Sequence, residues 1–211
     1  MPPVCFIKVL NLKKIMLSTK EQKQLQLDQL HQLYQFCTAC PLGTSGRKQV
    51  VFGEGNPAAS LMLIGEAPGR EEDEQGKPFI GRSGRLLTAS LSQAGIQRSE
   101  IFITNIVKCR PPNNRAPRPA ESSTCQKLLL WHQIAIIQPK IIATIGACAL
   151  EPFLTPLQTG LKITQLHGQA FESKNILIVP LFHPAYILRN KTKLPDFIKD
   201  IEYLKQLLLK V

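Results

Sequence analysis

Residues 61–69 read LMLIGEAPG, and this stretch decides the fold class of the chain. Its first four side chains are all apolar, and a glycine ends the run. A short, uninterrupted apolar run of this kind indicates a strand that is buried on both faces, as in a parallel sheet. We therefore predict a buried parallel strand over 61–64, followed by a glycine-rich loop over 65–84.

Segments of the same character follow along the chain and alternate with helical patterns. Further strands are predicted over 101–106, 140–145 and 175–182. Helices are predicted over 19–36, from Ser83 to Gly95, and over 119–138, 147–154 and 195–209. This alternation predicts an α/β fold in which helices cover both faces of a parallel sheet. Ligands of such folds bind outside the carboxyl ends of the strands. A site is therefore expected among the segments 65–84, 105–118 and 183–189.

The composition favours a globular protein with a polyanionic partner. The 211 residues are 44% hydrophobic, which supports a packed core and argues against disorder. They carry a formal net charge of +11. No apolar run reaches the roughly 18 residues that a membrane span requires. The basic balance favours nucleic acid as the partner, with an anionic membrane surface second. We expect a cytoplasmic protein with a single domain over 18–211.

Residues 1–17 do not resemble a secretory signal. Their apolar stretch is short and interrupted by Lys8, and Lys13 and Lys14 follow it, whereas a signal peptide has its positive charges first. We expect a disordered or dispensable extension, with Met16 as an alternative start.

Four of the six cysteines have a spacing that suggests a metal site. Cys37 and Cys40 form a C-x-x-C pair, Cys109 follows the second predicted strand, and Cys125 lies in the next helix. Four thiolates from two regions suit an iron–sulfur cluster or a zinc ion. Alternatively, Cys109 and Cys125 are simply small buried residues. Cys148 lies in the apolar segment IGACAL and is expected in the core.

Several polar and aromatic residues fall in the predicted loops. A base could stack on Phe79, and a phosphate could bind at the helix start near Ser83. Asn105 ends an apolar strand, where its side chain needs a partner, and His183 ends the fourth strand. Taken singly, Phe79 is explained as a core residue, Asn105 as a turn cap and His183 as a structural histidine. Their convergence on one sheet edge favours a binding site.

Four motifs taken together resemble the family 4 uracil-DNA glycosylases, the iron–sulfur members of their superfamily. They are GEAPG (65–69), KPFIG (77–81), TNIVKCRPP (104–112) and HPAY (183–186). The resemblance covers about residues 30–210. It implies a three-layer sandwich around a four-stranded parallel sheet, and a [4Fe–4S] cluster rather than zinc, held by Cys37, Cys40, Cys109 and Cys125.

The resemblance also implies roles for individual residues. Asn105 would bond the Watson–Crick edge of uracil, Phe79 would stack on the flipped base, and His183 would donate to uracil O2. Glu72 would crowd the C5 position and so exclude the thymine methyl group. The same substrate pocket would include Gly65 and Ala67. The implied DNA contacts are Ser83, Arg110, Arg115, Tyr186 and Arg189. Residues 185–189 would belong to a loop that wedges into the duplex.

The implied activity is extrusion of uracil from single- or double-stranded DNA and hydrolysis of its N-glycosidic bond by a monomer. A related branch activates water with an aspartate at the position that Ala67 occupies here, so Glu66 is the neighbouring candidate for a catalytic role. A second branch forms a covalent adduct through an inserted KRRIH segment, which this sequence lacks. We therefore expect turnover.

Other functions remain compatible with parts of the pattern. A non-catalytic iron–sulfur DNA-binding module would have the same basic composition, but it has no need of a base pocket formed by Asn105, Phe79 and His183. A redox carrier or sensor would show a reversible potential without base excision. A zinc protein would lack the brown colour of an iron–sulfur cluster.

Overall fold

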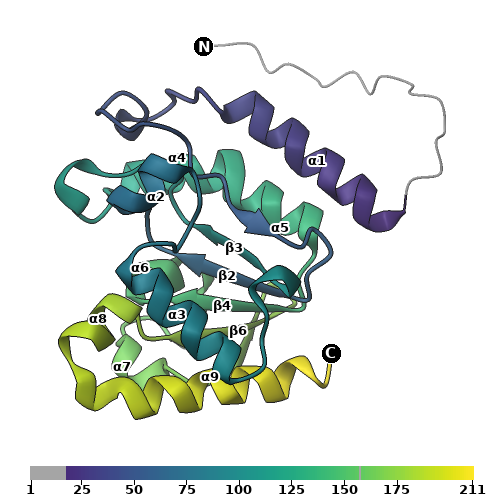
Figure 1. Cartoon of the computed structure of the whole chain (residues 1–211), viewed down its shortest axis with the longest axis vertical. Helices are drawn as coiled ribbons and strands as arrows, with labels where there is room; N and C mark the ends of the chain where they lie inside the picture. The colour runs from purple at the N-terminus through teal and green to yellow at the C-terminus, as the bar shows by residue number, and fades with distance from the viewer. Residues whose placement is uncertain (1–17, 157) are drawn as a thin grey trace.

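The architecture is a central sheet between two layers of helices, as given by a computed structural model that describes residues 18–156 and 158–211 (Figure 1). The predicted extension over 1–17 lies outside the described residues. Four parallel strands form the centre of the sheet in the order β3-β2-β4-β6. They are β2 (Leu61–Gly65), β3 (Phe102–Asn105), β4 (Ile141–Ile145) and β6 (Ile176–Leu181). The predicted three-layer fold with a parallel sheet is confirmed.

Two short antiparallel strands extend the sheet at its edges, so it has six strands and not the four predicted. β1 (Glu54–Gly55) pairs with β3, and β5 (Phe171–Ser173) pairs with β6. Both are too short to show the alternating or continuous apolar pattern from which a strand is recognised. They cover the edges of the parallel sheet, which would otherwise present unpaired backbone groups.

The two faces of the sheet bury alternate residues of each strand. Met62 and Ile64 of β2 pack into one apolar cluster, whereas Leu61 and Leu63 pack into the other. The first cluster is covered by α1 (Thr19–Tyr34), α4 (Pro119–Cys125), α5 (Trp131–Ile137) and α6 (Ala147–Leu150). The second is covered by α3 (Arg82–Gln93), α8 (Pro184–Arg189) and α9 (Leu194–Leu208). The short α7 (Ile163–Leu166) contacts β6.

The helix predicted over 119–138 contains a π-helical turn at Gln126–Leu130, between α4 and α5. The backbone N–H of Trp131 donates to the carbonyl of Gln126, five residues earlier. Such a turn inserts one extra residue into an α-helix and often occurs at functional sites. Cys125 lies at its beginning.

Three local predictions need correction at the carboxyl edge. The N-cap of α3 is Gly81 and not Ser83, which lies inside the first turn. The segment 65–84 is not all loop, because α2 (Arg70–Gln75) forms within it and carries the acidic cluster. The segment 183–189 is likewise a helix, α8, with His183 as its N-cap. Among the described residues, no helix is both long enough and apolar enough to cross a bilayer.

Candidate active site

A cavity of about 720 Å³ lies at the carboxyl edge of the parallel strands. The predicted pocket residues that line it are Glu66, Ala67, Glu72, Phe79, Asn105 and His183. Of the predicted DNA contacts, Ser83, Arg115 and Arg189 also line it, whereas Arg110 and Tyr186 do not. The structure thus brings together side chains from four segments that are far apart in the sequence.

Asn105 ends β3 with a side chain that is buried but incompletely bonded. Only 1% of the residue is exposed, and its Oδ1 has no hydrogen-bond partner among the described residues. An unpaired buried acceptor costs about 1–3 kcal/mol, so such atoms are rare without a functional reason. Since Asn105 lines the cavity, a ligand with a donor group can satisfy this oxygen.

Gly65 does not line the cavity, but it permits the arrangement of the residues that do. A Cβ atom at this position would stand 2.4 Å from Asn105 Oδ1 and 2.4 Å from Cζ of Phe79. Both distances are far below van der Waals contact. Any larger residue would therefore displace Asn105, Phe79 or both.

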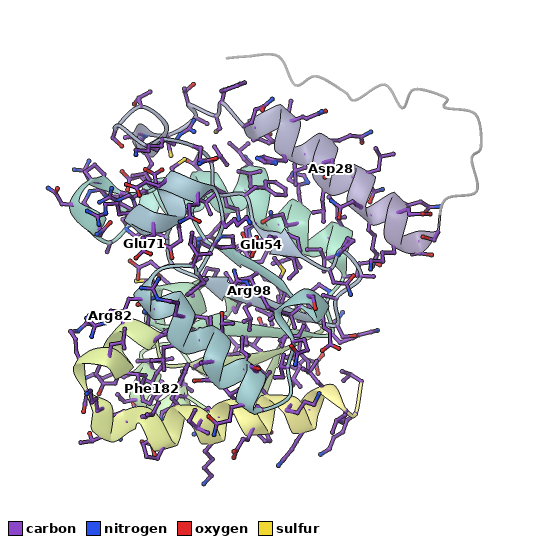
Figure 2. The ribbon with its side chains drawn as sticks, viewed as in Figure 1. Asp28, Glu54, Glu71, Arg82, Arg98 and Phe182 are labelled. Atoms are coloured by element: carbon purple, nitrogen blue, oxygen red, sulfur yellow. The ribbon has the colours of Figure 1, made fainter. Side chains whose placement is uncertain are left out.

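Phe79 is buried beside the cavity in a backbone conformation that is rare for its residue type. Its φ is +52°, a left-handed value that costs a residue other than glycine about 1–3 kcal/mol. The Arg98 guanidinium donates to the carbonyls of Pro78 and Phe79, the latter at 3.2 Å. Arg98 is itself fixed by an ion pair of 2.8 Å with Glu54, and Figure 2 labels both residues.

The backbone that follows Phe79 is held by a second charged side chain. Oε1 of Glu72 accepts the backbone N–H groups of Ile80 at 3.0 Å and Gly81 at 2.8 Å. A Cβ atom on Gly84 would stand 1.9 Å from the Phe79 carbonyl oxygen, so this close approach requires glycine. Glu72 therefore positions the Phe79 segment in addition to lining the cavity.

His183 faces Phe79 across the cavity, with 6.2 Å between the ring centroids. Its Nδ1 accepts the backbone N–H of Ala185 at 3.1 Å. Burial and the positive charge of Arg189 lower the pKa of His183 to about 4, against the opposing effect of Glu72. The ring is therefore neutral near pH 7, and its proton is on Nε2.

Cys148 lies beside Glu66 in the cavity and not in the apolar core, which corrects the prediction from its apolar neighbours. Burial and a hydrogen bond with the Glu66 carboxylate raise the pKa of the Cys148 thiol to about 12. The thiol therefore stays protonated near pH 7 and can donate to Glu66.

The predicted DNA contacts differ in how free their side chains are. Arg115 makes two bonds to the buried Glu121, at 2.8 and 2.7 Å, and this lowers the pKa of Glu121 to about 2. Arg110 bonds the side chain of Asn114 at 2.8 Å. Tyr186 accepts a bond from Asn190 at 3.2 Å. These three residues thus have intramolecular partners.

Two arginines that the sequence analysis did not single out also line the cavity. Arg70 and Arg82 are exposed and are the first residues of α2 and α3. Each directly follows a glycine that serves as the N-cap. The repeated Gly-Arg pair in this loop is the sequence signal that could have identified them.

The four predicted metal ligands line one small second pocket, together with Lys108 and several apolar side chains. We call the set Cys37, Cys40, Cys109 and Cys125 the cysteine cage. All four are free thiols. Burial raises the pKa of Cys109 to about 12, although the positive charge of Arg47 acts in the opposite direction. Within the described residues, no three His, Cys, Asp or Glu side chains are grouped closely enough to hold a single metal ion.

The chain is similar to known proteins over most of its length. Residues 52–207 match the family model of the uracil DNA glycosylase superfamily. A type-4 uracil-DNA glycosylase of Thermotoga maritima is 44% identical over 82% of this chain and 90% of its own. One of Pyrobaculum aerophilum is 37% identical over 84% of this chain and 92% of its own. A type-5 enzyme of Thermus thermophilus is 27% identical over 56% of this chain and 67% of its own.

The fold, the pocket at the carboxyl edge and the family match define a member of the uracil-DNA glycosylase superfamily. Within that superfamily, the chain belongs to the type-4 uracil-DNA glycosylases.

Proposed function

We propose that this protein excises uracil from DNA by hydrolysing the N-glycosidic bond and leaves an abasic site. The observation that carries the proposal is the unpaired Oδ1 of Asn105 in a cavity that also contains Phe79 and His183. A base within a duplex cannot reach such a cavity, so the nucleotide must be extruded at a cost of a few kcal/mol.

Asn105 and Phe79 together hold the flipped base, and Asn105 selects it. Uracil carries an N–H donor at N3, which Asn105 Oδ1 can accept. Cytosine has a lone pair at N3, so it would leave this buried oxygen unpaired and opposed by another acceptor. The Phe79 ring offers a stacking surface for either base. Selectivity therefore comes from Asn105, and from Glu72 if its carboxylate crowds the methyl group of thymine.

His183 supports departure of the base. Negative charge develops on uracil as the glycosidic bond stretches, and a preorganised donor at O2 stabilises it. Nε2 of neutral His183 is such a donor, and one donor of this kind contributes roughly 3 kcal/mol in other enzymes. Glu66, with a thiol donor from Cys148, is the carboxylate that we propose to orient the attacking water.

The DNA backbone would be held by the basic residues around the cavity. Arg70, Arg82 and Arg189 are exposed there, and Ser83 lies in the first turn of α3. Arg115 lines the cavity, so it can meet a phosphate while it remains bonded to Glu121. Arg110 and Tyr186 would act at the periphery. Phosphate contacts of this kind supply affinity rather than sequence choice.

We further propose that the cysteine cage holds a [4Fe–4S] cluster. Four thiols around one pocket match the four-cysteine ligand set of such a cluster. When bound, the cluster would link the end of α1 to the loop after β3. We also propose a single-domain monomer over 18–211 that acts in a reducing compartment such as the cytoplasm, where cysteines such as those of the cage stay reduced.

The test is release of uracil from an end-labelled oligonucleotide with one uracil opposite guanine, followed by alkali and inspection of strand cleavage. Cleavage at uracil but not at thymine in the same position is expected. If protein with intact iron content gives no cleavage, the glycosylase proposal is wrong. A DNA-binding module or a redox protein would then explain the fold and the cysteine cage.

A further inference from the structure

A fully buried lysine lies between the two pockets. Lys108 is 0% exposed, and its Nζ donates to three oxygens: Thr104 Oγ1 at 2.5 Å, the Asn105 carbonyl at 2.7 Å and Gln133 Oε1 at 2.7 Å. An ammonium group has three N–H donors, so all of them are used. Gln133 is also fully buried, and its amide donates to the Phe52 carbonyl at 2.8 Å.

The backbone of the same residue contacts the cysteine cage. The N–H of Lys108 donates a hydrogen bond to the sulfur of Cys125. Its carbonyl accepts the N–H of Val51 at 2.7 Å, and its side chain lines the cage pocket. One residue therefore bonds a cage sulfur with its backbone and the carbonyl of Asn105 with its side chain.

No carboxylate accepts a hydrogen bond from the ammonium group of Lys108. All three acceptors of its ammonium group are uncharged, and a buried charge without a counter-ion is costly. Cys109 and Cys125 line the cage pocket together with Lys108. The thiolate ligands of an occupied cage would therefore supply negative charge beside this lysine.

We propose that Lys108 is a positioning residue that couples the cysteine cage to Asn105. Its bond to the Asn105 carbonyl fixes the end of β3, from which the Asn105 side chain enters the cavity. Its charge balances the cage. This inference rests on the proposed function, because it assigns Lys108 a role in presenting the amide that selects uracil.

Three variants separate the two parts of the proposal, which are the support of Asn105 and the balance of charge at the cysteine cage. Lys108→Met keeps an unbranched side chain but removes the charge and all three bonds. Gln133→Leu removes one partner of Lys108 and does not contact the cage sulfurs. Arg47→Gln is the matched control: Arg47 bonds the Cys37 carbonyl at 2.8 Å and places a second positive charge near Cys109, but it makes no contact with Asn105.

The measurements use the iron-loaded full chain. Iron content and the cluster midpoint potential report on the cage. Inhibition by free uracil and the single-turnover excision rate report on Asn105. Affinity for an oligonucleotide with a stable abasic analogue reports on backbone contacts and serves as the internal reference.

For Lys108→Met we expect excision to slow, and the uracil inhibition constant to rise, by about 10-fold or more, because small misplacements of reacting groups cost on this scale. The potential should become more negative, and affinity for the abasic analogue should be unchanged. Arg47→Gln should shift only the potential, and Gln133→Leu should weaken only uracil inhibition and excision.

A Lys108→Met protein with wild-type uracil inhibition and excision would overturn the coupling, as would an unchanged potential. If Lys108→Met does not fold, Gln133→Leu decides, because unchanged uracil inhibition in that variant also overturns the proposal. Failure of the proposed function is distinguishable, since wild-type protein itself would then neither release uracil nor be inhibited by it.

Discussion

The backbone N–H of Ala185 donates to Nδ1 of His183 at 3.1 Å and thereby determines which nitrogen of the ring carries the proton. Protonation of Nδ1 would break this bond and place a charge in a largely buried site next to Arg189. The fold thus favours the neutral ring with Nε2–H directed to a ligand.

The pH dependence of stability should show this preference. The pKa of His183 is about 4 in the fold, against about 6.5 in an unfolded chain, so the unfolded chain binds the proton first as pH falls. The stabilising contribution of the neutral ring is fully present above about pH 6.5 and is lost as pH falls towards 4. Its part of the slope in unfolding free energy approaches about 1.4 kcal/mol per pH unit. Denaturant titrations at several pH values in this range give the free energy of unfolding of wild type and His183→Gln. Its dependence on pH should be steeper for wild type, and an equal dependence in both proteins would refute the assignment of the neutral ring.

His183→Ala should reduce the excision rate more than it weakens DNA binding. The lost donor acts on the departing base, so the single-turnover rate should fall on the order of 100-fold, with little change in affinity for uracil-containing DNA. Rapid-quench excision and fluorescence anisotropy measure the two quantities. Equal losses in rate and affinity would show that His183 binds the ground state.

Gly65→Ala should abolish excision in a protein that still folds. The added methyl group would stand 2.4 Å from both Asn105 Oδ1 and the Phe79 ring, so one of these side chains must leave its position. Circular dichroism should remain close to that of wild type because Gly65 ends its strand. Full activity in this variant would mean that the observed positions of Asn105 and Phe79 are not needed for the reaction.

Arg98→Ala should lower excision by releasing the Phe79 segment. Arg98 bonds two carbonyls there, and its loss removes one of the restraints on a backbone with positive φ. We expect a loss of about 10-fold in rate, in keeping with the 1–3 kcal/mol held in such a conformation. Lys205→Ala is a suitable control, because Lys205 also bonds a loop carbonyl, that of Gly95, but on an exposed surface away from the cavity. Equal effects of both substitutions would argue against a specific role for Arg98.

Cys109→Ser should remove bound iron, whereas Cys148→Ser should retain it. Cys109 belongs to the cysteine cage, and Cys148 lies in the other pocket beside Glu66. Iron analysis and the visible absorption of the purified proteins distinguish the two outcomes. Iron loss in Cys148→Ser with retention in Cys109→Ser would reverse the assignment of the ligands.

The sequence predicted the parallel strands and the convergence of Phe79, Asn105 and His183, because uninterrupted apolar runs and their carboxyl ends are visible in a linear pattern. It did not predict β1 or β5, which are too short to show a repeating pattern of apolar residues. It also did not predict the role of Glu72 as a brace for Ile80 and Gly81, since a carboxylate that bonds a backbone eight or nine residues away has no local signature. The sequence also did not predict the role of Lys108. A lysine is ordinarily exposed, and only the fold shows that this one is buried.

The π-helical turn at Gln126–Leu130 has a consequence for helix phase. In an uninterrupted α-helix, residues eight apart differ by about 80° around the axis, whereas residues seven apart differ by only about 20°. The one extra residue of the turn therefore aligns Cys125 with Gln133, and both contact Lys108 from the same side. Deleting one residue from this turn would restore an uninterrupted α-helix with the two residues seven apart, so their alignment should persist. Closing the turn into an α-helical one without a deletion would instead leave them about 80° apart and rotate Gln133 away from Lys108. The extra residue of the turn, more than the identity of its side chains, keeps the two pockets in register.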